Sequence, residues 1–137
     1  MKKGPPPAVP PAVRRRMLSA AREARAAAYA PYSRFRVGAA ILCADGRIFA
    51  GCNVENASSP SSLCAEQSAV VRAVAGGARR FRAVLVLTGA ARPTPPCGRC
   101  RQVLAEFAGD LPVLMATTGG RGAEANLSSL LPHPFRR

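Results

Sequence analysis

The sequence has 137 residues, of which 48% are hydrophobic, and this length and composition suit one folded domain with one core. It carries 20 Lys and Arg against 7 Asp and Glu, for a formal net charge of +13. The basic residues are spread along the chain, which favours a solvated basic surface and disfavours a nucleic-acid partner.

The first residues favour a disordered leader. Residues 1–12 are mostly Pro, Ala and Lys, which offer little apolar surface to offset the entropy lost on ordering. Neither a signal-peptide core nor a run of roughly 20 apolar residues is seen, so we expect a cytoplasmic protein without membrane association. Its five cysteines are then expected to bind metal or to be buried, and the folded domain to cover residues 13–137.

The first half of the chain predicts a helix, a hairpin and a second helix. Residues 12–29 are rich in Ala, Arg, Leu and Glu without an internal Pro or Gly, which indicates a helix. The apolar run 35–42, an Asp-Gly turn and residues 47–53 predict a β-hairpin. A loop at 57–62 precedes a helix over 65–75 that a Gly-Gly pair ends.

The second half predicts two more strands around a third helix. Residues 82–88 form a short apolar run typical of a buried strand, followed by a loop. A helix is expected over 97–107, a strand over 111–117 and, after a glycine-rich turn, a short element over 126–131. This order predicts an α/β fold, a mixed sheet with helices on both faces.

Three cysteines lie at predicted helix starts. Cys97 and Cys100 have the two-residue spacing that lets two thiolates face one ion, and Cys64 opens another helix. Free amide N–H groups and the partial positive charge of a helix start favour thiolates. The pattern therefore predicts a zinc ion held by these three residues.

The ligand count favours a catalytic zinc over a structural one. Three protein ligands leave a coordination position for water, and the only histidine, His133, is a poor fourth ligand in a Pro-rich tail. Cys43 and Cys52 lie in the hairpin, where burial as small hydrophobic residues is expected. Glu66, two residues after Cys64, is placed to contact a zinc-bound water. We therefore expect it to act as the general acid and base.

Two stretches resemble the signature of zinc-dependent deaminases. Residues 64–66 read Cys-Ala-Glu and residues 96–100 read Pro-Cys-Gly-Arg-Cys, the form in which cysteine replaces the first histidine. With residues 32–40, 51–56 and 130–132, this set resembles the small homotetrameric cytidine deaminases. The resemblance implies a three-layer α/β/α fold with a sheet of about five strands.

The resemblance also implies a substrate site for a pyrimidine nucleoside. Phe35 and Ala65 would lie near the substrate, and Asn53 and Glu55 would hydrogen-bond the ribose hydroxyls, although both could instead anchor a loop. Phe135 matches a C-terminal aromatic residue that reaches a neighbouring subunit's active site. A homotetramer with shared active sites is therefore expected.

The implied reaction is hydrolytic deamination of cytidine or 2′-deoxycytidine with release of ammonia. A zinc-activated water would attack C4 of the pyrimidine, while Glu66 protonates N3 and then the leaving amino group. Three other functions stay open: a deaminase of an antibiotic resembling blasticidin S, a polynucleotide deaminase, and a non-enzymatic zinc module.

Two positions depart from the common family pattern. Gln67 stands where an arginine usually offsets the charge of the cysteines, so this compensation would come from Arg99, Arg101 or the helix ends. Ser59 lies where many relatives carry a tyrosine. A smaller residue there could widen the base pocket and admit pyrimidines with bulky groups on N4 or C5.

Overall fold

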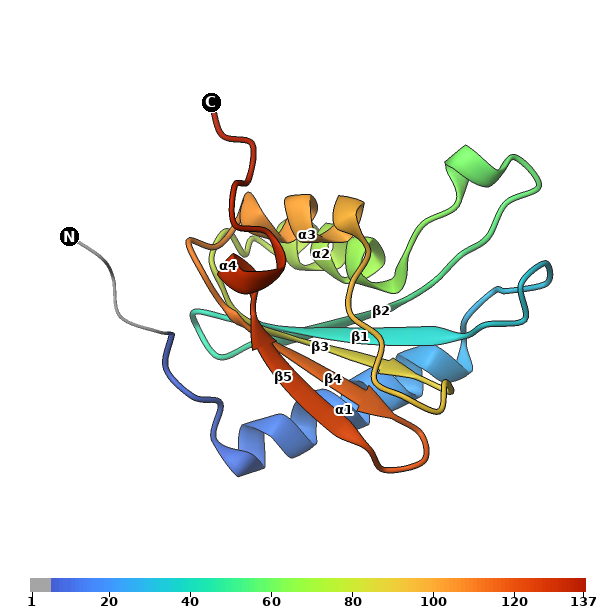
Figure 1. Cartoon of the computed structure of the whole chain (residues 1–137), viewed down its shortest axis with the longest axis horizontal. Helices are drawn as coiled ribbons and strands as arrows, with labels where there is room; N and C mark the ends of the chain where they lie inside the picture. The colour runs from blue at the N-terminus through green and yellow to red at the C-terminus, as the bar shows by residue number, and fades with distance from the viewer. Residues whose placement is uncertain (1–5) are drawn as a thin grey trace.

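The computed structural model describes residues 6–137, which form one five-stranded sheet between helices on both faces (Figure 1). The strand order is β2-β1-β3-β4-β5, with β3 and β4 parallel and the other neighbours antiparallel. The elements in chain order are α1 (Pro11–Ala26), β1 (Val37–Cys43), β2 (Ile48–Cys52), the 3₁₀ turn η1 (Ser59–Ser61), α2 (Ala65–Ala75), β3 (Phe81–Thr88), α3 (Gly98–Ala105), β4 (Pro112–Thr117), β5 (Gly122–Asn126) and α4 (Leu127–Leu130). The predicted three-layer α/β/α arrangement and mixed sheet are confirmed.

Both faces of β1 are covered, which explains its continuous apolar sequence. Ala39 and Ile41 belong to the core beneath α2, whereas Ala40 and Leu42 belong to the core beneath α1. Figure 1 shows α1 on one face of the sheet, and α2 and α3 side by side on the other. No helix in the range 6–137 is long and apolar enough to cross a membrane.

Two glycines let the helices lie unusually close to the sheet. A Cβ atom at Gly38 of β1 would lie 2.0 Å from the carbonyl oxygen of Ala21 in α1. A Cβ atom at Gly51 of β2 would lie 2.4 Å from the backbone nitrogen of Ala69 in α2. Because backbone atoms make both contacts, no side-chain rotation could relieve the clash, and the height of each helix above the sheet is fixed.

The folded part of the chain begins before the predicted boundary. Val9 is only 7% exposed and packs in the core beneath α1, and Pro11 opens that helix. A proline suits this position because the first helical N–H has no partner within the helix. The expected leader therefore overlaps the folded part at 9–12, while residues 1–5 of it lie outside the described residues. The helix also ends at Ala26, three residues before the predicted end.

The chain-order prediction missed the edge strand β5. Gly122, Glu124 and Asn126 have weak strand propensity, so the segment reads as a turn. It becomes a strand by pairing antiparallel with β4 over its whole length. Arg14 of α1 donates to the carboxylate of Glu124 at 3.0 Å, linking this edge to the first helix.

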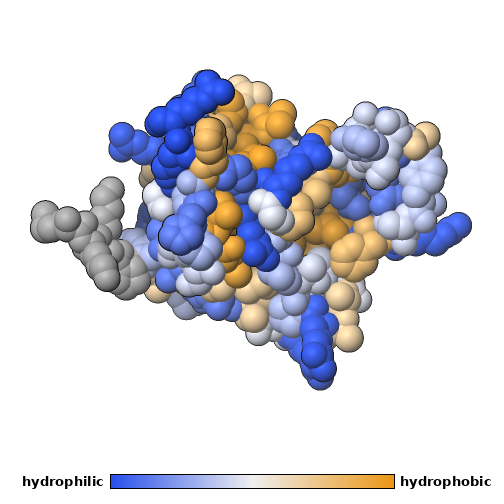
Figure 2. Space-filling view, turned by 45° about the horizontal axis from the view of Figure 1, so that its top comes forward, coloured by the Kyte–Doolittle hydropathy of each residue, from blue (hydrophilic) through white to orange (hydrophobic). Residues whose placement is uncertain are grey.

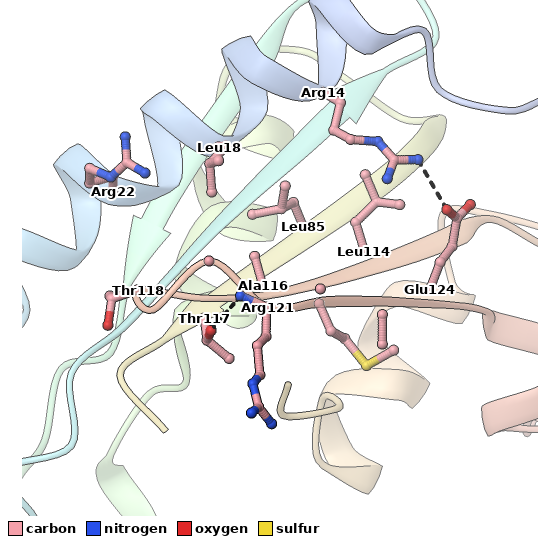
Figure 3. A pocket seen from close by; sticks show the side chains of 14 residues that line it. Arg14, Leu18, Arg22, Leu85, Leu114, Ala116, Thr117, Thr118, Arg121 and Glu124 are labelled. Atoms are coloured by element: carbon pink, nitrogen blue, oxygen red, sulfur yellow. Dashed lines mark hydrogen bonds and ion pairs between the residues drawn. The ribbon is translucent and has the colours of Figure 1, made fainter. Parts of the chain in front are cut away.

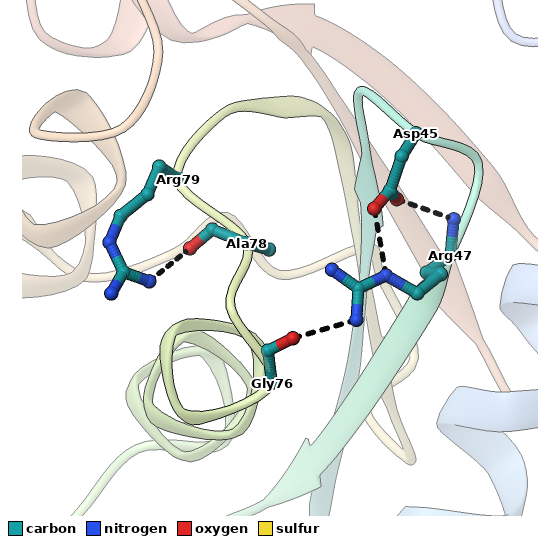
Figure 4. A network of polar contacts seen from close by, with 5 residues as sticks. All are labelled: Asp45, Arg47, Gly76, Ala78 and Arg79. Atoms are coloured by element: carbon teal, nitrogen blue, oxygen red, sulfur yellow. Dashed lines mark hydrogen bonds and ion pairs between the residues drawn. The ribbon is translucent and has the colours of Figure 1, made fainter.

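A polar network fixes the C-terminal end of α2 (Figure 4). Arg47, just after the hairpin turn, donates from Nε to Oδ2 of Asp45 at 2.8 Å and from Nη1 to the carbonyl of Gly76 at 2.7 Å. In the loop that follows α2, Arg79 donates to the carbonyl of the preceding residue, Ala78, at 2.9 Å. The hairpin thus holds the last turn of α2 while the first turn carries Cys64 and Glu66.

Candidate zinc and active site

The three predicted ligands meet where two helices begin. Cys64 caps α2 and Cys97 caps α3, both with extended backbone, and Cys100 lies in the first turn of α3. The Sγ atoms of Cys97 and Cys100 are 3.3 Å apart, and those of Cys64 and Cys97 are 3.9 Å apart. All three sulfur atoms lie within 4.8 Å of one another.

This triangle fits a zinc ion. Zn–S bonds of about 2.3 Å in tetrahedral geometry place two sulfurs about 3.8 Å apart, close to the separations seen here. Within residues 6–137, no other histidine, cysteine or acid joins this three-sulfur group. His133 is exposed, and Cys43 is buried as predicted, while Cys52 is only half-buried. Three sulfur ligands leave the fourth tetrahedral position for water or substrate.

The three thiols also affect one another's protonation. A hydrogen bond from Cys100 is the main cause that lowers the pKa of Cys64 to about 6, with further contributions from Cys97 and the charge of Arg99. The same hydrogen bond with Cys64, followed by burial, raises the pKa of Cys100. Thiols this close share protons, and a cation replaces those protons when it binds.

Glu66 lies in the first turn of α2 and is 5% exposed. Burial raises the pKa of its carboxyl group to about 7, and the nearby Cys64 contributes in the same direction. A buried carboxyl group in a cavity beside a metal site is a common feature of acid and base catalysis. Its position agrees with the role predicted from its spacing to Cys64.

A cavity of about 390 Å³ opens beside these groups. Its walls combine the metal-site residues with an apolar side and a polar end. Among the predicted site residues, those lining it are Phe35, Asn53, Glu55, Cys64, Ala65, Glu66 and Cys97, together with Ser59. Cys100 is fully buried, does not line the cavity and completes the group of three sulfur atoms.

Asn53 and Glu55 are the polar end of this cavity, and both hold the loop between α1 and β1. Asn53 accepts from the backbone N–H of Val37 at 2.9 Å and donates to the carbonyl of Phe35 at 2.8 Å. Glu55 accepts from the backbone N–H groups of Tyr32 and Ser33 at 2.9 and 3.1 Å. Both side chains therefore anchor the loop, as the alternative interpretation expected. Each keeps some hydrogen-bonding capacity that the loop does not use.

Sequence reasoning missed Ser33, whose hydroxyl also donates to Glu55 and whose side chain lines the same cavity. This hydrogen bond is the main cause that lowers the pKa of Glu55. The contact spans 22 residues along the chain. In the sequence, only the family resemblance of residues 32–40 indicated that this segment belongs to the site.

The two arginines and the glutamine near the cysteines have different surroundings. Gln67 is buried, and its side-chain oxygen accepts from the backbone N–H of Cys64 at 3.0 Å. Arg101 donates to the carbonyls of Pro96 and Leu130 at 2.8 Å each, so it ties the loop before α3 to α4. Arg99 is exposed, and of the two arginines its charge is the one that lowers the pKa of Cys64.

Phe135 and Cys100 are the predicted site residues that do not line this cavity, and only Phe135 lies outside the thiol group as well. Its side chain is 70% exposed, and its backbone is held by Gln102 of α3. The Gln102 side chain donates to the Phe135 carbonyl at 2.9 Å and accepts from its N–H at 3.0 Å. The tail is thus fixed to the helix that carries Cys100, with the ring facing outward.

A hollow of about 490 Å³ lies on the opposite face of the sheet, beside α1 (Figure 3). Leu18, Leu85 and Leu114 form its floor, and the Arg14–Glu124 pair lies at its rim. None of the predicted site residues lines it among residues 6–137. The candidate active site is therefore the smaller cavity beside the cysteines.

Apolar surface gathers on the face that α2 and α3 cover (Figure 2). Several large apolar side chains near the cavity are exposed, which a lone globular chain seldom keeps together. They are Tyr29, Tyr32, Phe35, Val54 and Leu63. Backbone bridges join Tyr29 to Val54 and Val54 to Leu63, so these three residues are neighbours in space.

The chain is similar to known deaminases over most of its length. Residues 12–116 match the family model described as the cytidine and deoxycytidylate deaminase zinc-binding region. The chain is 42% identical over 123 residues to a cytidine deaminase of Sporosarcina psychrophila, covering 89% of this chain and 90% of the relative. It is 44% identical over 123 residues to a cytidine deaminase of Halalkalibacterium halodurans, covering 89% and 93%.

Solved structures agree. The crystal structure of cytidine deaminase from Burkholderia pseudomallei matches with a TM-score of 0.84 at 43% identity, over 88% of this chain and 98% of that one. That of cytidine deaminase from Mycobacterium tuberculosis matches with a TM-score of 0.77 at 41% identity, over 90% and 98%.

We expect the protein as purified to contain one zinc ion per chain, and Cys97→Ser to remove most of it. A serine hydroxyl is a poor ligand for zinc compared with a thiolate, and two remaining thiolates hold the ion weakly. Elemental analysis of the purified protein measures the zinc content. Cys52→Ser, outside the triangle, is the matched control and should keep full zinc; equal zinc in the Cys97 variant would contradict the assignment.

Proposed function

Because the chain belongs to the zinc-binding cytidine and deoxycytidylate deaminase family, we propose that it hydrolyses the 4-amino group of cytidine and 2′-deoxycytidine. The products are ammonia and the corresponding uridine. One observation carries this proposal: a buried carboxyl group, Glu66, and two members of the three-thiol metal site line one cavity large enough for a nucleoside.

The chemistry divides between the metal and one side chain. Zinc bound by Cys64, Cys97 and Cys100 supplies Lewis-acid activation of water next to the substrate. Glu66 would take one proton from that water and deliver it to N3 of the pyrimidine as the water oxygen bonds to C4. It would then take the remaining proton of that oxygen and pass it to the amino group, so that the C4–N bond breaks, ammonia leaves and the C4 carbonyl forms. Its first-turn position on α2 keeps the carboxylate within reach of the site while the cysteines serve as ligands.

The remaining walls suit a nucleoside. Phe35, Leu63 and Val86 provide apolar surface for the pyrimidine ring, and Ala65 lies beside Glu66 where the base edge would lie. Asn53 and Glu55 are at the polar end, where a sugar would lie. An apolar wall with a few polar groups at one end orients a ligand that has a flat base and a hydroxylated sugar.

The free hydrogen-bonding capacity at the polar end is enough to bind a sugar hydroxyl. Asn53 uses one N–H and one acceptor position on the loop, which leaves one N–H and one acceptor position. Glu55 accepts three hydrogen bonds from Tyr32 and Ser33, which leaves about one acceptor position. One hydroxyl accepts from Asn53 and donates to Glu55. Since a second hydroxyl is not required, 2′-deoxycytidine should be accepted as well as cytidine.

The alternatives fit the site less well. A non-enzymatic zinc module needs a fourth ligand, and within residues 6–137 the metal group has three members. A polynucleotide deaminase finds support only in the positive charge. A deaminase for an antibiotic resembling blasticidin S keeps the metal site, but the pair of Asn53 and Glu55 favours a ribose.

We expect the wild-type protein to deaminate cytidine and 2′-deoxycytidine, and Glu66→Gln to lower the rate by about 10²–10⁴-fold, the usual contribution of a general acid and base. A glutamine keeps the shape of the side chain but cannot carry the proton. Ammonia release is measured with cytosine, both nucleosides, blasticidin S and single-stranded DNA as substrates.

Zinc content separates chemistry from metal loss in that experiment. The Glu66→Gln variant should retain its zinc, because the carboxylate is not a ligand. Retained turnover in the variant, or turnover of blasticidin S or DNA in preference to the nucleosides, would contradict the proposal.

We further propose that the enzyme is a homotetramer with shared active sites. Phe135 lies outside its own chain's cavity, is exposed, and is held in place by Gln102. The exposed apolar residues around the cavity favour contact with another subunit. In the proposed tetramer the C-terminal tail of a neighbouring subunit packs over them, and its Phe135 packs on the bound base.

Phe135→Ala should lower kcat/KM by about 10- to 100-fold, the cost of removing a buried aromatic contact from the substrate. The decisive measurement mixes two inactive or weakened variants, Phe135→Ala and Glu66→Gln, and reassembles them. In a mixed oligomer, a chain with intact Glu66 receives Phe135 from a Glu66→Gln neighbour, so activity rises. A monomer in sedimentation analysis, or no gain on mixing, would exclude shared sites.

Ser59 leads us to propose a wide substrate range at the base. Its small side chain lines the cavity from η1, where a larger residue would reduce the space near the ring. Pyrimidines substituted at N4 or C5 should then be accepted.

We expect Ser59→Tyr to reduce turnover of N4-substituted cytidines by about 10-fold or more, because filled pockets reject added groups by such factors. Turnover of cytidine itself should change little. Parallel kinetics with both substrates check this, and Ser61→Tyr, in the same turn but outside the cavity lining, is the control. Rejection of every substituted cytidine by the wild-type protein would refute a wide pocket.

A further inference from the structure

The loop between α1 and β1 forms one wall of the active-site cavity in a strained conformation. Arg34 has a φ of 57°, in the left-handed region that residues with a side chain rarely adopt. Its N–H donates to the carbonyl of Ala30 at 3.0 Å, which closes a tight turn. Such a conformation is unfavourable for a residue with a side chain and persists only when neighbouring contacts hold it.

The Ser33 hydroxyl is at the centre of those contacts. It donates to Oε2 of Glu55, and it accepts from the backbone N–H of Phe35 at 3.0 Å. The backbone N–H of Ser33 donates to the other carboxylate oxygen of Glu55 at 3.1 Å. One side chain therefore links the residue proposed for the sugar to the residue proposed for the base.

This link determines which part of Glu55 remains available. The N–H groups of Tyr32 and Ser33 occupy Oε1, and the Ser33 hydroxyl occupies one position of Oε2. The remaining acceptor direction is on Oε2, beside the hydroxyl of Ser33. Without that hydroxyl, the carboxylate keeps its anchor on Oε1 but can rotate its other oxygen.

We propose that Ser33 is a positioning residue for substrate recognition, whose hydroxyl directs Glu55 toward the sugar and fixes the backbone that presents Phe35 to the base. This inference rests on the proposed nucleoside function. Ser33 lines the cavity but acts through its two neighbours, so its effect depends on what the sugar offers to Glu55. A residue that only stabilised the loop would affect all substrates alike.

The test compares two substrates in three proteins. Ser33→Ala should lower kcat/KM for cytidine by about 10-fold relative to wild type, the scale of a lost hydrogen bond to a charged group. With 2′,3′-dideoxycytidine, which has no hydroxyl for Glu55, the same variant should lose about twofold or less. Ser33→Thr keeps a hydroxyl at this exposed position and should restore most of the activity on cytidine.

Ser19→Ala, an exposed serine of α1 outside the cavity lining, is the matched control and should match wild type on both substrates. Absence of cytidine turnover by the wild-type protein would contradict the proposed function itself. Wild-type turnover together with equal losses in Ser33→Ala on the two substrates would overturn only the role of Ser33, as would unchanged kinetics in that variant.

Discussion

The meeting of two helix starts is the constraint on which the site depends. Cys64 and Cys97 cap α2 and α3 with extended backbone, so their thiols lie over the helix ends, and Cys100 approaches from the first turn of α3. The positions of both helices must hold to within a fraction of an ångström for three sulfurs to share one ion. For α2, the close contact of Gly51, the hydrogen bond that Arg47 donates to Gly76 and the one that Gln67 accepts from Cys64 help to fix its position.

The site combines residues at helix starts with residues on a loop. The metal ligands and Glu66 lie on helix starts packed against the sheet, whereas Phe35 lies on a loop held by side-chain hydrogen bonds. Chemistry needs fixed geometry, while recognition can use a segment whose anchors also contact the ligand. Asn53 and Glu55 hold the loop, and in the proposed function they would also contact the sugar with the capacity that remains.

The metal site could be predicted from the sequence because its features are local. Cysteine spacing and helix-start position lie within a few residues of one another, and the α2 boundaries follow from its flanking loop and Gly-Gly end. Long-range pairing could not be predicted. Tyr29 leaves the expected helix because its backbone pairs with Asn53 and Glu55, and β5 forms because β4 is beside it.

The two helix starts also affect the net charge of the metal site, to which Gln67 adds no positive charge. Three thiolates around a divalent zinc sum to a charge of −1, and Gln67 brings no positive charge to offset it. Each helix N-terminus is equivalent to roughly +0.5 of an elementary charge, so two of them together offer roughly +1 at the same point. Gln67 strengthens this arrangement by fixing the first turn of α2 through the Cys64 N–H. The two helix starts that bring the ligands together would therefore also offset part of this charge once zinc is bound, and the charge of the exposed Arg99, which lowers the pKa of Cys64, would add to it.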